Sequence, residues 1–270
     1  MRPSLHDHGH GDGGFVDAWR AEWIKARTLA STGWLLGTTV VVGIGLSATV
    51  CAVIRYQKGG GLDLARFALS GIQLAQALVA IWAVQAVSGE YRSGMIRTTL
   101  TAIPRRTNVL TAKTAVITAL TLTVGTATVA GSLLIARAEL ADHGSAAADG
   151  LSFAVTAGPT LRAAFGSILY LGLIGLLATG AALAVRDSAA ATGVVLSLLY
   201  LFPLAAQLTG SAAWQRHLQQ VGPTTAGLAI QDTINLQAVP IQPWAGLAVL
   251  AAWAGASILI GGLVLHLRDP

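Results

Sequence analysis

The segment over residues 89–106, GEYRSGMIRTTLTAIPRR, holds the side chains of this chain that are most able to bind a partner. Guanidinium groups bind phosphates and carboxylates through fixed pairs of N–H donors. Gly94 is suited to start, and Pro104 to end, a short helix with apolar residues at helical spacings. The segment therefore indicates either a loop resting on anionic lipid headgroups or a docking surface for a cytoplasmic protein. Its four arginines are Arg92, Arg97, Arg105 and Arg106.

Several kinds of chemistry are not indicated. The chain contains no Gly-x-x-x-x-Gly-Lys-Ser/Thr, so we do not expect it to hydrolyse ATP. No Ser, His and Asp fall into a catalytic motif, and we predict no enzyme activity and no catalytic residue. Histidines at positions 6, 8 and 10 could hold a metal ion only loosely, and a flexible tail over residues 1–14 is the favoured interpretation. We predict no metal site and no cofactor bound by this chain.

The composition places the chain in a membrane. Of its 270 residues 54% are hydrophobic and 11% charged, and the mean hydropathy is +0.65. The net charge of +5 is typical of loops held on the cytoplasmic side, so we expect a lipid bilayer and no nucleic acid as partner. Six apolar runs are long enough to cross a bilayer as helices. They cover residues 34–54, 67–87, 114–135, 164–185, 189–209 and 244–267.

The positive-inside rule favours a cytoplasmic location for both termini. With that orientation 11 of the 17 Lys and Arg residues lie inside and 6 outside. None of the six runs holds a charged residue at its centre, which argues against a secondary transporter with an intramembrane acid. The polar side chains within the runs are neutral, and we expect them to join helices or, alternatively, to line a weakly polar translocation surface. The candidates for that surface are Gln73, Gln76, Tyr200 and Gln207.

The segments beside the spans also have patterns. Residues 15–33 alternate apolar and polar positions as an amphipathic helix at the inner interface does. Residues 210–243 are too apolar for a solvated loop, and short re-entrant helices are expected there. The predicted fold class is an all-α membrane protein: an interfacial helix over 15–33, then a transmembrane domain over 34–270. A cytoplasmic helix between spans two and three and re-entrant helices between spans five and six complete it.

In this order, these features resemble the permease subunits of ABC-2-type transporters, the small six-span bacterial exporters. The resemblance rests on AEWIKART before span one, the segment 89–106, Lys113, the Arg186 hairpin and the apolar insert before span six. It implies a coupling helix that docks on a separate ATPase chain, where ATP and Mg would be bound. Carried over, the coupling region comprises Glu90, Tyr91, Arg92, Gly94, Met95, Arg97, Thr98 and Leu100, and the adjoining interfacial helix contributes Glu22 and Lys25.

The resemblance further implies two permease copies, identical or different, in a bacterial cytoplasmic membrane. Movement of the coupling helices would open a path between spans one, two and five, for a cargo that is amphiphilic by family analogy. Gly33 and Gly37 at GxxxG spacing would allow close approach of a second copy. The alternatives are a secondary transporter, or a membrane scaffold or immunity protein that binds a partner or a toxic peptide without ATP.

Overall fold

A computed structural model describes residues 13–54, 62–93, 106–141, 158–237 and 239–267. Within these ranges 89% of residues are helical and none lies in a strand. The first half of the chain forms α1 (Gly13–Thr28), α2 (Ala30–Ile54), α3 (Leu64–Ala68), α4 (Ile72–Ser93) and α6 (Arg106–Ala141). The second half forms α8 (Gly158–Val185), α9 (Ser188–Leu196), the π-helix η1 (Ser197–Leu201), α10 (Phe202–Gln207), α11 (Ala212–Val221), α12 (Pro223–Leu228), the 3-10 helix η2 (Ala229–Gln231) and α13 (Pro243–Leu267).

Six helical stretches are long and apolar enough to cross a membrane, which confirms the predicted all-α, multi-pass class. The second stretch covers Ile72–Tyr91, because the short helix α3 and the turn Leu69–Gly71 precede it. The third is longer than the predicted apolar run, since its helix continues to include Thr107 and Glu139. The other four are Ala30–Ile54, Gly158–Val185, Ser188–Gln207 and Pro243–Leu265.

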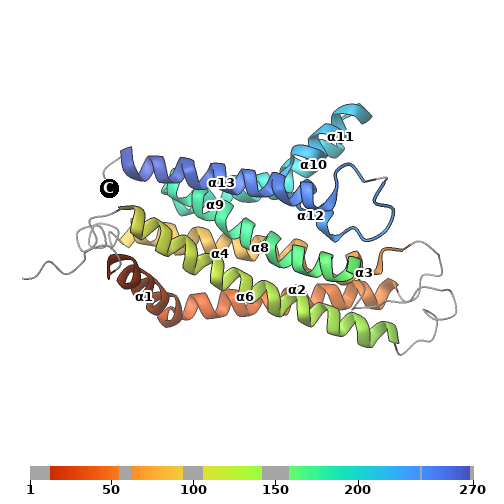
Figure 1. Ribbon diagram of the computed structural model, residues 1–270, viewed down its shortest axis with the longest axis horizontal. Helices are drawn as coiled ribbons and strands as arrows, with labels where there is room; N and C mark the ends of the chain where they lie inside the picture. Colours follow the sequence, from red (N-terminus) through yellow and green to blue (C-terminus); the bar gives the residue numbers. More distant parts are fainter. Residues whose placement is uncertain (1–12, 55–61, 94–105, 142–157, 238, 268–270) are drawn as a thin grey trace, which may run out of the picture.

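The spanning helices lie side by side along the long axis of the molecule (Figure 1). Their alternating directions bring α1, the end of α4, the start of α6 and the α8–α9 turn to one end, which we call the α1 end. The opposite, α3 end holds α3, α12 and the turn before α13. The central helix is α8, which packs against α4, α6, α9 and α13. Its side chains Tyr170, Leu171 and Ile174 are fully buried.

The crossing of α2 with the start of α4 depends on glycine. A Cβ atom on Gly71 would lie 1.8 Å from the carbonyl oxygen of Gly43, so no larger residue fits there. The amide of Gly71 donates to Ser47 Oγ at 3.0 Å, which satisfies a buried backbone donor at the same place. Gly33 and Gly37, by contrast, have open space where a Cβ would stand.

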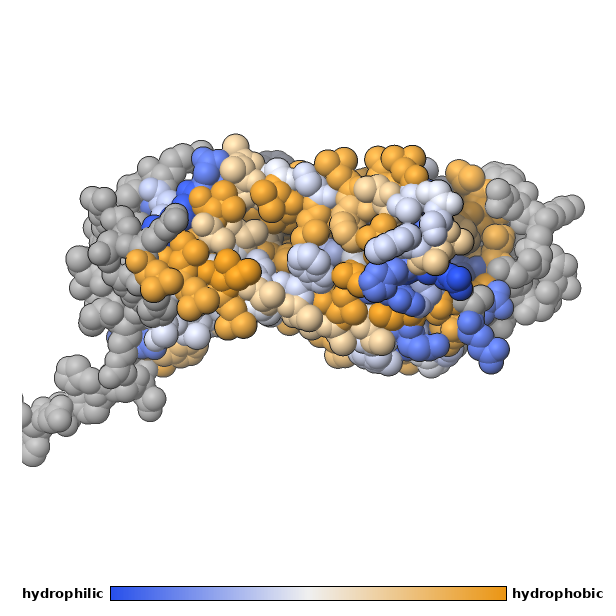
Figure 2. Space-filling model, turned by 90° about the horizontal axis from the view of Figure 1, so that it is seen from above, coloured by the Kyte–Doolittle hydropathy of each residue, from blue (hydrophilic) through white to orange (hydrophobic). Residues whose placement is uncertain are grey.

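The outer surface of the bundle is apolar. Trp34, Val41 and Leu259 are each about 70% or more exposed, which for a water-soluble protein would be a liability. Hydrophobic residues cover most of the face seen in Figure 2, and hydrophilic residues gather towards its ends. A lipid bilayer around the middle of the bundle accounts for this distribution.

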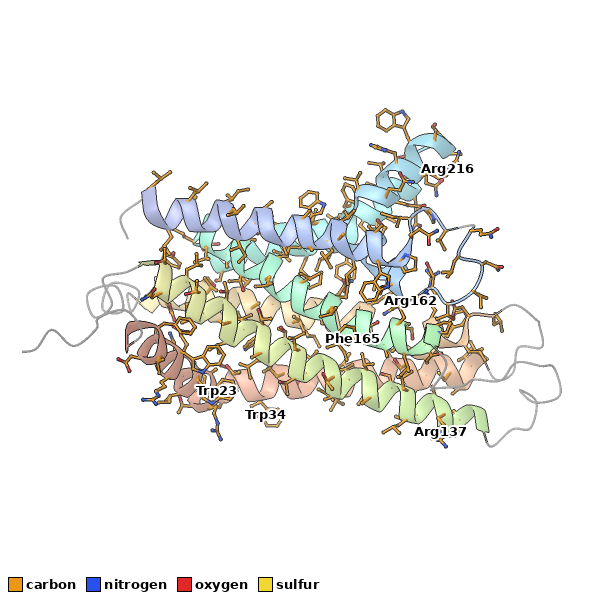
Figure 3. The ribbon with its side chains drawn as sticks, in the orientation of Figure 1. Trp23, Trp34, Arg137, Arg162, Phe165 and Arg216 are labelled. Carbon is orange, nitrogen blue, oxygen red and sulfur yellow. The ribbon has the colours of Figure 1, made fainter. Side chains whose placement is uncertain are left out.

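Two short helices lie against or beyond the bundle. In α1 the charged residues Glu22 and Lys25 face α4 and α6, whereas Phe15 and Val16 are exposed. Helix α11 has no buried residue and projects from the bundle near the α3 end (Figure 1). Its residues Trp214, 62% exposed, and Arg216, labelled in Figure 3, lie away from the spans.

Candidate functional site

Four charged side chains form a chain of ion pairs at the α1 end, which we call the Glu90 network. Lys113 of α6 donates to Glu90 Oε1 of α4 at 2.6 Å and to Glu22 Oε2 of α1 at 2.8 Å. Lys25 of α1 also donates to Glu90 Oε1. The side chains of Lys113 and Glu90 are only 4% and 3% exposed. The network therefore joins α1, α4 and α6 through charges removed from solvent.

The balance of charge in the network matters for its stability. An isolated buried ammonium or carboxylate is strongly disfavoured, whereas a hydrogen-bonded pair can be tolerated. Two lysines and two glutamates sum to zero formal charge, and Lys113 reaches both carboxylates. Removal of any central member would leave an uncompensated charge inside the protein.

A cavity of about 470 Å³ opens beside the network, between α1, α2, α4 and α6. Glu22, Lys25, Glu90 and Lys113 form its polar end. The remaining wall is mainly apolar and includes Leu29, Leu35, Trp82, Ala86, Val116 and Ile117. Ser31, Thr32 and Gln85 add neutral polar groups to this wall, so the charged groups gather at one end of the cavity and the wall is of mixed, mainly apolar character.

The α8–α9 turn completes the α1 end. It consists of Arg186 and Asp187, as the tight hairpin in the sequence predicts, and Arg186 has a left-handed φ of 63°. The Arg186 guanidinium lies over the ring of Tyr91, 5.4 Å from its centroid, and donates to the carbonyl of Val264 at 2.9 Å. Asp187 caps α9 by accepting from the Ala190 amide at 2.7 Å. Tyr91 is therefore a packing partner of the turn.

The predicted coupling region is described only in part. Glu90 is buried within the bundle, and Tyr91 is half-buried. Arg92 belongs to α4, but its side chain is outside the described part of the structure. Five further candidates and the predicted coupling helix also lie outside the described residues. These candidates are Gly94, Met95, Arg97, Thr98 and Leu100.

The predicted translocation residues divide into two groups. Gln76 is buried, and its Oε1 accepts from the hydroxyl of Tyr170. Gln73 is exposed, and its backbone carbonyl accepts from the hydroxyl of Tyr200, which is 36% exposed. Gln207 is also exposed but lies at the end of α10, seven residues after Tyr200. The structure therefore places Gln73, Gln76 and Tyr200 on or beside α4, whereas Gln207 lies apart from them. The hydrogen bond of Gln76 with Tyr170 joins α4 to α8.

Tyr170 and the pairing of Lys113 are the features that sequence reasoning missed. A tyrosine within an apolar run has a hydroxyl that needs a partner, which is the signal that could have drawn attention to Tyr170. From the sequence, Lys113 is only a basic residue that follows the predicted coupling segment. Its position near the start of an apolar run is equally typical of a residue that reaches for the interface.

A second polar cluster, which we call the Asp63 clamp, lies at the α3 end. Asp63 caps α3 by accepting from the Arg66 amide at 3.1 Å, and it accepts from the Thr233 amide and hydroxyl at 2.6 Å each. Arg66 pairs with Asp232 at 2.6 Å, and Arg162 of α8 donates to the Asp232 carbonyl. Burial raises the pKa of the Asp232 carboxyl despite the opposing effect of Arg66. The clamp fixes the turn after η2 to α3 and α8.

Comparison with known proteins identifies no family for this chain. No family model matches it, and a search of curated proteins finds no match. Among the described residues, no three His, Cys, Asp or Glu side chains gather as metal ligands would. The function of the Glu90 network and its cavity must therefore be inferred from their own residues.

Proposed function

We propose that this chain is the permease subunit of an ABC-2-type exporter in a bacterial cytoplasmic membrane. In this proposal a separate cytoplasmic ATPase binds ATP and Mg and docks at the α1 end. The cargo is amphiphilic, and the chain itself hydrolyses nothing. The proposal rests on the sequence resemblance together with the six spans and the construction of the α1 end.

The Glu90 network is the observation that carries the proposal. It lies immediately before residues 94–105, the expected coupling helix, and it ties α4 to both α1 and α6. A push on the coupling segment would reach α4 and α6 through the backbone. Because Glu90 and Lys113 are buried and paired, the same push would also move α1. Such a connection would transmit force from an external ATPase to three helices.

The finer architecture follows the same proposal. Helix α1 would be the interfacial helix, with its charged side on the bundle and Phe15, Val16 and the stacked pair Trp19 and Trp23 towards the headgroups. Helices α11 and α12 would form the re-entrant cap at the outer side. The exposed, amphipathic character of α11 supports that placement.

The transport path would lie along the outward face of α4 and its neighbours α2 and α9. Gln73, Gln85 and Tyr200 are exposed there among apolar side chains. Neutral polar groups on an apolar membrane face suit a second permease copy and an amphiphilic cargo better than an inorganic ion. The face would close against the same face of the second copy.

Isolation of the chain from its native membranes tests the proposal. We expect an ATPase with a phosphate-binding loop to co-purify with the tagged full-length chain. The double substitution Arg92→Ala with Arg97→Ala should remove this ATPase. Arg137→Ala with Arg216→Ala, which changes two arginines near the other end (Figure 3), should not. Absence of any ATPase from the wild-type preparation would contradict the proposal.

Cross-linking tests the second copy. In a Cys51→Ser background, Gly37→Cys should form an intermolecular disulfide in native membranes, because the space beyond Gly37 is open. Leu259→Cys on α13 is the matched control, since Leu259 is 69% exposed on another side of the bundle. Equal cross-linking at both positions would indicate random collision and would contradict a dimer through α2.

A further inference from the structure

The cavity beside the Glu90 network has the size of a ligand site. Its volume of about 470 Å³ falls within the range of small-molecule pockets, roughly 300–1,000 Å³. It lies at the α1 end, in the corner between α1 and α2 where Trp23 and Trp34 are labelled in Figure 3. Tryptophans mark the depth at which headgroups meet acyl chains. The cavity is therefore placed at the level of the membrane interface.

Two hydrogen-bond donors that line the cavity, the Lys25 ammonium and the Trp82 indole, can serve a ligand. An ammonium group has three N–H bonds, and within the described residues Lys25 donates one of them, to Glu90. The indole N–H of Trp82 is buried and has no acceptor in that same part of the chain. A buried donor without an acceptor is costly unless a ligand or water supplies one. Both donors suit acceptor atoms of a ligand, and the two further N–H bonds of the Lys25 ammonium favour an acceptor that carries negative charge.

The rest of the cavity wall is mainly apolar and suits the hydrocarbon part of a ligand. Leu29, Leu35, Ala86 and Ile117 line the cavity away from its charged end. Trp82 lies eight residues before Glu90, which is about two turns or 12 Å along α4. A ligand that fills the cavity must extend from a charged end into an apolar part.

We infer that the cavity binds one phospholipid with an anionic headgroup, taken from the leaflet at the α1 end. Its phosphate accepts from Lys25, one acyl chain runs along Leu35 and Ile117, and an ester carbonyl accepts from the Trp82 indole. The bound lipid fills the space between α1 and the spans and stabilises the packing of α1. This site goes beyond the proposed transport function and does not require an ATPase.

A substitution of Gly89 can fill the cavity without a clash with neighbouring residues at its Cβ. Gly89 lines the cavity, and a Cβ placed on it would meet nothing within 4 Å. Gly89→Leu should therefore fill the space that the lipid needs. Gly45→Leu is the matched control, since Gly45 is an exposed helical glycine of α2 with equally open surroundings.

The test is native mass spectrometry of the delipidated full-length chain in detergent, titrated with dioleoyl phosphatidylglycerol or dioleoyl phosphatidylcholine. We expect one phosphatidylglycerol to bind wild type and Gly45→Leu with equal affinity, and Gly89→Leu to raise its Kd about tenfold or more. Lys25→Gln should abolish the preference for phosphatidylglycerol over phosphatidylcholine, and Trp82→Phe should weaken both. Size-exclusion profiles establish that each variant is folded.

Three results would overturn the inference. Equal lipid binding by the two leucine variants would show that the lipid lies elsewhere. Equal affinity of wild type for the two lipids would exclude recognition of a net negative charge. Full competition by inorganic phosphate at a concentration equal to that of the lipid would show an anion site without an acyl-chain component.

Discussion

The Glu90 network and the Asp63 clamp both hold charged groups between segments distant in sequence, yet they satisfy those charges differently. In the Glu90 network, charged side chains of three helices pair with one another. In the clamp Arg66 and Asp232 pair as side chains, but Asp63 accepts from backbone amides and a hydroxyl, and Arg162 donates to a backbone carbonyl. Side-chain pairs can re-form when helices shift, whereas backbone bonds require one fixed fold of the chain.

Under the proposed function, this difference gives the two ends different tasks. The clamp fixes the turn after η2 against α3 and α8, so it should resist any movement of the α3 end. The Glu90 network connects three helices that each could move as a unit while their charges remain paired. If an ATPase docks at the α1 end, as proposed, the Glu90 network would carry its movement to these three helices.

The largest effect should come from a break in the centre of the Glu90 network. Among the described residues, Glu90→Gln leaves Lys113, which is 4% exposed, with Glu22 as its one charged partner. Breaking a buried pair costs about 3–5 kcal/mol, so the free energy of unfolding in detergent should fall by that order. Asp17→Asn is the control: Asp17 is an exposed carboxylate on α1, and its substitution should leave the free energy of unfolding nearly unchanged.

A double substitution sharpens that prediction. Glu90→Leu with Lys113→Met replaces the two buried charges with hydrocarbon and should recover most of the lost stability. Stability equal to that of Glu90→Gln would contradict the interpretation that uncompensated charge causes the loss.

Substitutions in the Asp63 clamp should have the next largest effect on the free energy of unfolding. Asp63→Ala leaves the Thr233 amide without its acceptor and should lower the free energy of unfolding by about 1–3 kcal/mol. Asp63→Asn keeps one acceptor oxygen and should cost less. Thermal unfolding of both variants in the same detergent measures the difference, and an equal loss in both would show that charge, and not acceptor geometry, holds the turn.

The rim of the Glu90 network should matter less than its centre. The Lys25 side chain is 26% exposed, so its pair with Glu90 is partly screened by solvent. Lys25→Gln should lower the free energy of unfolding by about 1 kcal/mol or less. Chemical denaturation at low and at high salt checks this, and a loss as large as that of Glu90→Gln would contradict the distinction between rim and centre.

The smallest effect is expected at Asp232. Because its pKa in the folded chain is raised by burial, the folded state binds a proton more readily than the unfolded state. Its contribution to stability is therefore greatest below the ordinary aspartate pKa and is lost as pH rises through the raised pKa. Asp232→Asn should change stability little at neutral pH and should remove this pH-dependent step. An unchanged step in the variant would assign it to another group.

The spans could be predicted from the sequence because membrane helices depend on local apolar length, and each of the six overlaps one predicted run. Exact starts could not, since the delayed second span depends on the contact of Gly71 with Gly43 of another helix. The same limit applies to the site. Lys25 and Glu90 are separated by 65 residues and Glu22 and Lys113 by 91, so these pairs form only when α1 packs on α6 beside the end of α4.

Glu90 shows why the burial of a charged residue could not be predicted from its sequence neighbours. From sequence it belongs to a polar segment and is expected at a docking surface. In the structure it is 2% exposed, because two lysines from other helices compensate its charge. Gln76 is similar: its burial depends on the Tyr170 hydroxyl, 94 residues away.

The affinity of the co-purified ATPase for the chain in nanodiscs tests the central claim, that external ATP energy enters at the α1 end, most directly. The account predicts that Arg92→Ala with Arg97→Ala raises the Kd of this complex about tenfold or more, while Arg137→Ala with Arg216→Ala leaves it unchanged. An equal Kd for both double variants, or a loss confined to the second, would contradict the account.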